Sequence, residues 1–207
     1  MKKIYIALLA VMALSVAASA EVGIGLKGGI FQQDNNLQNL ALSSSPSISN
    51  DKYFGGAEFI FQDWIATTGM LGFKIGAEFR APLKMTDDIL NDEFKNDFYS
   101  FPVTLYYKFV PECSMINFWL GGGVTVAYSR WAVDMNNYPP VNMSESDIVV
   151  FPHLKAGIEL RATQHVALGL DVGYNFAAKA NSSFAGLSQM QRDITGFEGN
   201  LALRFYF

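Results

Sequence analysis

One ten-residue stretch predicts the fold of this chain: Leu71-Gly72-Phe73-Lys74-Ile75-Gly76-Ala77-Glu78-Phe79-Arg80. Its odd-numbered positions are apolar, and its even-numbered positions are glycine or charged. Because successive side chains of a β-strand point to opposite faces, this alternation indicates a strand with one apolar and one polar face. A tilted strand of this length spans roughly 25 Å, the height of the apolar band of an outer-membrane barrel.

The same alternation recurs along the chain, near residues 22–31, 53–63, 70–80, 98–110, 117–130, 149–161, 166–176 and 194–207. Apart from Asp63 and Arg130 at the very ends of two segments, the apolar phase carries no charge. The opposite phase is rich in glycine and carries twelve charged residues: Lys27, Glu58, Lys74, Glu78, Arg80, Lys108, Lys155, Glu159, Arg161, Asp171, Glu198 and Arg204. An uncharged face suits lipid, where Lys or Arg at the midplane costs about 2–4 kcal/mol. Since backbone groups in lipid must all be paired, the sheet must close.

Connection lengths predict the topology. Segments 32–52, 81–97, 131–148 and 177–193 are long and polar, whereas 64–69, 111–116 and 162–165 are short. Strict alternation of long and short connections is typical of outer-membrane barrels, with long loops outside and tight turns in the periplasm. A soluble eight-stranded barrel of the lipocalin type would explain neither this asymmetry nor the uncharged face. We therefore expect an all-β, eight-stranded antiparallel up-and-down transmembrane barrel, with Cys113 in a periplasmic turn.

Composition excludes several classes of protein. The chain has 207 residues, of which 50% are hydrophobic, so it is not intrinsically disordered. A single cysteine excludes a disulfide scaffold and a cysteine-based zinc site. The net charge of -4 argues against a nucleic-acid partner, which requires a basic face.

Residues 1–20 are predicted to be a secretory signal peptide. Lys2 and Lys3 form a basic start, an uncharged and mostly apolar run extends from Ile4 to Leu14, and Ala18-Ser19-Ala20 matches a cleavage site. The apolar run is too short to span a membrane as a helix. We therefore expect residues 21–207 to form one barrel domain in the bacterial outer membrane.

Aromatic residues gather near the expected strand ends and predict two interfacial girdles. The outer girdle would contain Tyr53, Phe54, Phe98, Tyr99, Tyr128, Trp131, Phe151, Tyr174 and Phe176. The periplasmic girdle would contain Phe61, Trp64, Tyr107, Phe109, Phe118, Tyr206 and Phe207. Pro102 and Pro152 lack a ladder donor, so we expect a bulge or irregular pairing at each of them.

The chain resembles the small eight-stranded outer-membrane barrels of the OmpA/OmpX-like superfamily, also described as porin-family or outer-membrane beta-barrel domain proteins. The resemblance rests on residues 101–107 (FPVTLYY), 120–124 (LGGGV), 155–159 (KAGIE) and 203–207 (LRFYF). It implies that Phe207 is the assembly signal, read by the barrel-assembly machinery after periplasmic chaperones have delivered the chain. Because no peptidoglycan-binding domain follows the barrel segments, the tethering role of two-domain members is not expected.

Candidate chemistry is sparse. Ser129 and His153 share the inward phase near the expected outer rim, where lipid A-modifying enzymes work, and Glu159 lies six residues beyond His153. The chain lacks the His-x-Ser-Asn signature of those enzymes, so we expect no catalytic site and no cofactor, with His153 as a hydrogen-bonding lumen residue. His165 is expected in a solvated turn. The acidic run from Asp87 to Glu93 lacks EF-hand spacing, so a solvated loop is favoured over a metal site.

Two functions remain open. The first is a structural or interaction role, in which a plugged barrel displays four long extracellular loops to an unknown extracellular partner. The second is a narrow channel for small or hydrophobic solutes, which OmpW-like relatives suggest. Side chains just fill an eight-stranded barrel, and seven bases facing five acids would cross-link its walls, so the first is favoured. We expect a monomer in contact with outer-membrane lipid and lipopolysaccharide, although the acidic loops would repel lipopolysaccharide phosphates unless divalent cations bridge them.

Overall fold

The computed structural model describes residues 20–33, 47–49, 52–66, 69–87, 92–110, 115–135, 141–176, 179–182 and 190–207. The described residues form eight long strands: β1 (Glu21–Gln33), β3 (Tyr53–Ala66), β4 (Gly69–Asp87), β5 (Asp92–Phe109), β6 (Ile116–Met135), β7 (Val141–Arg161), β8 (Val166–Asn175) and β11 (Gly196–Tyr206). Three short strands lie in the connections: β2 (Ser47–Ser49), β9 (Lys179–Ser182) and β10 (Met190–Asp193). Within these ranges no helix is long and apolar enough to cross a membrane. The predicted signal peptide, apart from Ala20, and Cys113 lie outside the described residues.

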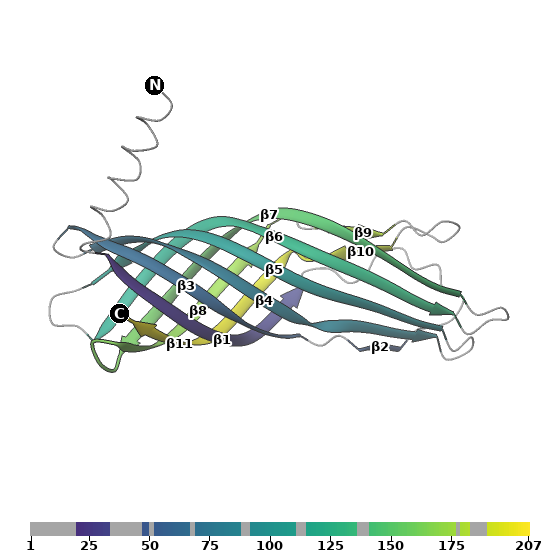
Figure 1. Ribbon diagram of the computed structural model, residues 1–207, viewed down its shortest axis with the longest axis horizontal. Coiled ribbons are helices and arrows are strands. Elements are labelled where there is room, and N and C mark those ends of the chain that lie inside the picture. Colours follow the sequence, from purple (N-terminus) through teal and green to yellow (C-terminus); the bar gives the residue numbers. More distant parts are fainter. Residues whose placement is uncertain are drawn as a thin grey trace, which may run out of the picture.

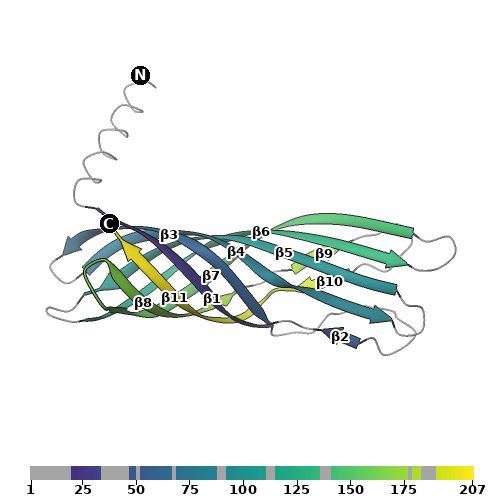
Figure 2. The ribbon, with the colours of Figure 1, turned by 60° about the horizontal axis from the view of Figure 1, so that its bottom comes forward.

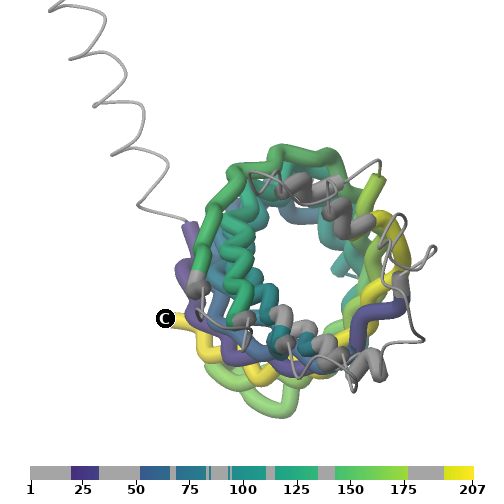
Figure 3. The backbone as a smooth tube through the Cα atoms, turned by 90° about the vertical axis from the view of Figure 1, so that its right-hand side faces the viewer, coloured from purple at the N-terminus to yellow at the C-terminus, as the bar shows by residue number. Residues whose placement is uncertain are grey.

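The eight long strands close into an antiparallel barrel, which confirms the predicted fold class. Each strand pairs with the next along the chain, and β1 pairs with β11 from Gly23 opposite Tyr206 to Gln33 opposite Gly196. The backbone forms a complete ring when viewed along its long axis (Figure 3). We call the end where β1 begins and β11 ends the terminal end, and the opposite end the loop end (Figure 1).

Four strands run much further than the sequence predicts. The segments 81–97 and 131–148 were expected to be loops, but β4 and β5 pair as far as Asp87 and Asp92, and β6 and β7 pair as far as Met135 and Val141. These strands reach past the rest of the wall at the loop end (Figures 1 and 2). The alternation of apolar and polar residues fades here, yet backbone pairing does not require an apolar face. We call this part of β4 to β7 the strand extension.

The predicted irregularity at proline is only partly observed. At Pro102 the β4–β5 ladder skips two pairs without a change of register, and β5–β6 pairing is continuous. At Pro152 the β6–β7 ladder is also continuous, and β7–β8 pairing begins one residue later, at His153. The register shifts instead between Arg80 and Leu83, around Pro82, and near Trp64. The two prolines singled out in the sequence therefore interrupt or border a ladder without shifting its register.

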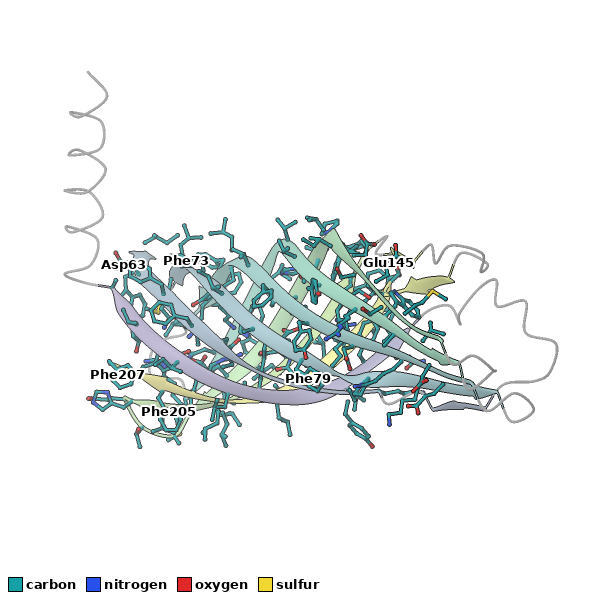
Figure 4. The ribbon with its side chains drawn as sticks, turned by 45° about the vertical axis from the view of Figure 1, so that its right-hand side comes forward. Asp63, Phe73, Phe79, Glu145, Phe205 and Phe207 are labelled. Carbon is teal, nitrogen blue, oxygen red and sulfur yellow. The ribbon has the colours of Figure 1, made fainter. Side chains whose placement is uncertain are left out.

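The outward face of the wall is apolar. Leu26, Leu105, Leu120 and Leu201 are each at least 59% exposed, with no charged side chain among the neighbours on their phase. Phe73, Phe79, Phe205 and Phe207 also lie outside the wall (Figure 4).

The two predicted aromatic girdles need correction. Phe54, Phe98, Trp131, Phe151 and Tyr206 were assigned to the girdles but are buried on the inward phase. Position near a strand end predicted their height along the barrel, but the two-residue period decides which face they occupy.

Candidate functional site: the charged lumen

The structure places the twelve charged residues of the inward phase in the lumen. Ten are at most 7% exposed: Glu58, Lys74, Glu78, Arg80, Lys108, Lys155, Glu159, Asp171, Glu198 and Arg204. The side chain of Lys27 is 5% exposed, and that of Arg161, at the terminal end, is 26% exposed. Charges enclosed to this degree are stable only when they are paired or hydrogen-bonded, so their contacts define the site.

Five of these residues form a loop-side cluster. Glu78 accepts a 2.5 Å bond from Lys27 and lies 3.7 Å from the Nζ of Lys155. Lys155 also pairs with Glu198, which lies 3.7 Å from a terminal nitrogen of Arg80. The cluster links β1, β4, β7 and β11, so it ties opposite sides of the wall together.

Five others form a terminal-side cluster centred on Arg204. The guanidinium donates from Nε to Glu58 at 2.7 Å and from Nη1 to Glu159 at 3.4 Å, and it also pairs with Asp171. Lys108 donates to the other oxygen of Glu159 at 2.8 Å. One arginine thus joins β3, β7, β8 and β11 through three carboxylates.

The terminal opening of the lumen contains residues that the sequence did not single out. Arg161 donates to Glu21 at 2.6 Å, and Gln62 also donates to Glu21. Tyr106 in turn donates to Gln62 at 2.7 Å, and Tyr206 donates to Glu159 at 2.6 Å. Glu21 and Gln62 are not among the twelve predicted lumen charges. The inward phase of Gln62 on β3 could have identified it as a lumen residue.

Most lumen ion pairs do not join neighbouring strands. The shared phase of Lys74, Glu78 and Arg80 with Glu58 and Lys108 on the flanking strands predicts that these five side chains pair with one another. The register instead places Gly76 opposite Glu58 and Met70 opposite Lys108. Because the lumen is narrow, most of these long side chains reach past the neighbouring strand, whereas Arg204 and Asp171 pair between the adjacent strands β11 and β8.

Lys74 makes a different kind of contact. Its Nζ is buried without a hydrogen-bond partner and lies 3.5 Å from the ring centroid of Trp119 and 4.9 Å from that of Tyr106. An ammonium over an aromatic face is attracted by the ring quadrupole. Lys74 therefore lies between the two clusters without an ion pair to either of them.

Apolar side chains form two further clusters in the lumen. At the loop end, a buried cluster consists of Phe31, Phe54, Phe98, Ala127, Phe151 and Ile194. A second cluster lies among the terminal-side charges and consists of Ile60, Tyr106, Trp119, Ala167 and Tyr206. The guanidinium carbon of Arg80 lies 3.8 Å from the ring centroid of Phe31, so the loop-side cluster packs directly beneath its apolar layer.

The space between the two clusters holds little free volume. A cavity of about 10 Å³ lies between the two clusters, bordered by Lys27, Lys74, Thr104 and Asn200, which is room for about one water molecule. At Gly169 and Gly157, a Cβ would collide with Arg204 and with Trp119, respectively. The glycines therefore leave space for the large side chains that fill the lumen.

The residues weighed as a catalytic group do not form one hydrogen-bonded unit. The ring nitrogens of His153 each lie 2.8 Å from a hydroxyl, that of Thr104 and that of Thr125. The hydroxyl of Ser129 instead accepts a 2.8 Å bond from Asn96. Glu159 belongs to the terminal-side cluster.

Three further candidates lie apart from the lumen. His165 is exposed in the turn between β7 and β8. Phe207 is 75% exposed at the terminal end, where its backbone N–H donates to Val22 across the β1–β11 seam at 2.8 Å. The acidic run 87–93 is largely outside the described part, with only the side chain of Glu93 placed.

Comparison with known proteins supports this architecture. A family model described as outer membrane protein beta-barrel domain matches residues 5–205. A major outer membrane protein from Thermus thermophilus aligns at 12% identity and a TM-score of 0.61, over 91% of this chain and 100% of that chain. OprG from Pseudomonas aeruginosa aligns at 12% identity and 0.56, over 91% and 96%. Ail, the attachment invasion locus protein of Yersinia pestis, aligns at 12% and 0.54, over 91% and 97%. These identities show a shared fold alone. No curated protein sequence matches the chain.

Proposed function

The chain belongs to the outer membrane protein beta-barrel domain family, and from this membership we propose that it is a closed barrel with a structural and interaction role. In this role the wall reinforces the bacterial outer membrane and the loop end is presented to partners outside the cell. The protein acts as a monomer without a cofactor and without catalytic activity.

The observation that carries this proposal is the filled lumen. Two ion-pair clusters connect opposite walls, apolar side chains pack on the loop side of them and among the terminal-side charges, and the cavity between the clusters measures only about 10 Å³. A steady ion pathway would require several buried pairs to separate together. Separating even one buried pair is costly, because each ion then loses both water and its partner.

A planar-bilayer conductance measurement on the purified full chain tests the proposal. We expect no steady open level, while a known porin inserted in the same bilayers serves as the positive control. Protein that has lost its heat-dependent shift in gel mobility is excluded, so that silence cannot result from misfolding. A stable, ohmic conductance would overturn the proposal and favour the narrow channel for small or hydrophobic solutes.

The orientation is a separate part of the proposal. The strand extension and the two longest connections, β1 to β3 and β8 to β11, lie at the loop end, as in outer-membrane barrels whose long loops and protruding hairpins face outward. We expect Cys113, in a short connection of the terminal end, to react with an impermeant maleimide only after the outer membrane is permeabilised. Efficient labelling on intact cells would invert the orientation.

Assembly supplies another testable part. The proposed signal, Phe207, is exposed beside the seam where β11 closes on β1, in a position open to the barrel-assembly machinery and to periplasmic chaperones. Deletion of Phe207 should lower the amount of heat-modifiable protein in outer membranes. Phe197→Ala is the control, because it removes an exposed aromatic ring at the other end of β11. Unchanged assembly of the Phe207 deletion would remove the signal role.

A further inference from the structure

The lipid-facing surface of β4 to β6 has a sharp upper boundary. Phe79, Tyr99 and Tyr128 are direct neighbours on three adjacent strands, with ring centroids 5.3 and 6.5 Å apart. The next outward positions on β5 and β6 are Asp97 and Arg130, which face each other in the ladder. Two residues advance a strand by about 7 Å, so charge begins immediately above the aromatic row.

A pocket of about 430 Å³ lies on the strand extension above this boundary. Its polar lining comes from Glu93 and Lys95 on β5, Arg130 and Asp134 on β6, and Ser144 on β7. Arg130, Asp134 and Ser144 are exposed on the same outward phase as Tyr128 and its neighbours. The pocket therefore opens sideways, toward the membrane surface that surrounds the barrel.

The basic groups of this pocket are available to a ligand. Arg130 makes no ion pair with any other residue that the structure describes. Among the residues that the structure describes, Lys95 pairs only with Asp97, at 3.2 Å, and its side chain stays 41% exposed. A free guanidinium presents a planar pair of donors that matches phosphate oxygens, and an exposed lysine adds a second positive charge.

The acidic groups and the nearby apolar wall narrow the class of ligand. Glu93, Asp134 and Ser144 offer oxygens that accept hydrogen bonds from sugar hydroxyls, whereas they would weaken the binding of a bare anion. The apolar surface below the aromatic row suits acyl chains. A ligand that meets all three features carries a phosphate, a sugar and fatty acyl chains.

We propose that this pocket binds the phosphorylated sugar headgroup of a membrane glycolipid, with Arg130 and Lys95 on its phosphate. Glu93, Asp134 and Ser144 contact the sugar hydroxyls, and the acyl chains lie along the wall below Tyr99 and Tyr128. In the cell this role rests on the orientation proposed above, which would place the pocket in the outer leaflet. The binding itself does not depend on the conductance of the lumen.

The experiment uses the full chain in phosphatidylcholine nanodiscs that contain increasing fractions of lipid A, a phosphorylated diglucosamine lipid. Binding is read as the rise in the temperature at which the folded gel mobility is lost. We expect Arg130→Gln to raise the half-saturating fraction of lipid A about tenfold, the typical loss for one charged hydrogen bond. The double variant Lys95→Gln/Arg130→Gln should lose more, and Arg130→Lys should retain part of the binding. Lys52→Gln, at an exposed base outside the pocket, is the matched control.

Further arms identify the source of the phosphate. Phosphatidylglycerol in place of lipid A should protect weakly, and soluble glucosamine 1-phosphate should not protect at comparable occupancy. Equal protection by phosphatidylglycerol would mean attraction to any anionic lipid, and equal protection by the soluble phosphosugar would mean a ligand from solution. Either result overturns the proposal, as does an Arg130→Gln variant that folds and binds lipid A normally.

A variant of the acidic residues provides the most decisive test. If Glu93 and Asp134 contact sugar hydroxyls, Glu93→Gln/Asp134→Asn should weaken the binding of lipid A. If they only repel phosphate, the same variant should strengthen it. Stronger binding would overturn the assignment of a sugar to this pocket.

Discussion

The two ion-pair clusters of the lumen differ in how completely their charges are satisfied. In the terminal-side cluster, Arg204 contacts three carboxylates, and Glu159 also receives Lys108 and the hydroxyl of Tyr206. In the loop-side cluster, two of the ion pairs are 3.7 Å long, and the Nε and Nη1 of Arg80 have no hydrogen-bond partner.

Because of this difference, the two clusters contribute differently to the stability of the barrel. A guanidinium that holds three carboxylates fixes the relative positions of four strands, because losing it leaves several buried charges unpaired. A guanidinium packed under the rings of Phe31 and Phe98, with one long ion pair, is held more by aromatic contact than by charge. We therefore infer that the terminal-side cluster stabilises the barrel, and that any transient opening begins at the loop side.

The largest expected effect is that of Arg204→Ala. Glu58 loses its 2.7 Å partner and Asp171 loses its ion pair, so the free energy of unfolding should fall by about 3–5 kcal/mol. Urea titration in phospholipid vesicles, followed by tryptophan fluorescence, measures this loss. Arg161→Ala, at the partly exposed terminal opening, should cost less than about 1 kcal/mol and is the control. Equal losses for the two variants would remove the central position of Arg204.

A smaller effect is expected for Arg80→Ala. Glu198 keeps Lys155 and a 3.3 Å bond from Asn175, so the loss should be about 1–2 kcal/mol, mostly from the cation–π contacts. Because the apolar layer at the loop end is loosened, brief openings should become more frequent in bilayer recordings. Arg80→Met keeps an unbranched apolar stem under Phe31 and should show fewer openings. A loss as large as that of Arg204→Ala would contradict the distinction between the clusters.

The sequence predicts the wall of this barrel well. The alternation in segments such as 71–80 needs no long-range information, because the pleat of a strand assigns each side chain to a face. The inward position of Lys27, Asp171 and Arg204 follows from that period in the same way. Closure follows from the requirement that every backbone group in lipid be paired.

The partners inside the lumen could not be predicted, because they depend on the stagger of the strands around the ring. Arg204 reaches Glu58 and Glu159 from strands that are not its neighbours in the sheet, and no local pattern specifies that contact. The strand extension was missed for a different reason. Outside lipid, residues such as Asp97 and Asp134 are polar on the outward phase, so the alternation that identifies a strand disappears.

The smallest expected effect is that of Lys74→Met, which tests whether a buried charge without a partner stabilises either cluster. Lys74 forms cation–π contacts with Trp119 and Tyr106 but no hydrogen bond and no ion pair with a described residue. Replacing it removes about 1–2 kcal/mol of cation–π attraction and relieves a desolvation cost of similar or larger size. The free energy of unfolding should therefore change by less than about 1 kcal/mol or rise. Lys108→Met is the matched control, because Lys108 donates to Glu159 at 2.8 Å, and its loss should cost about 1.5–3 kcal/mol. If both variants lose the same stability in urea titrations, pairing is not what distinguishes the lumen charges, and the comparison of the two clusters fails.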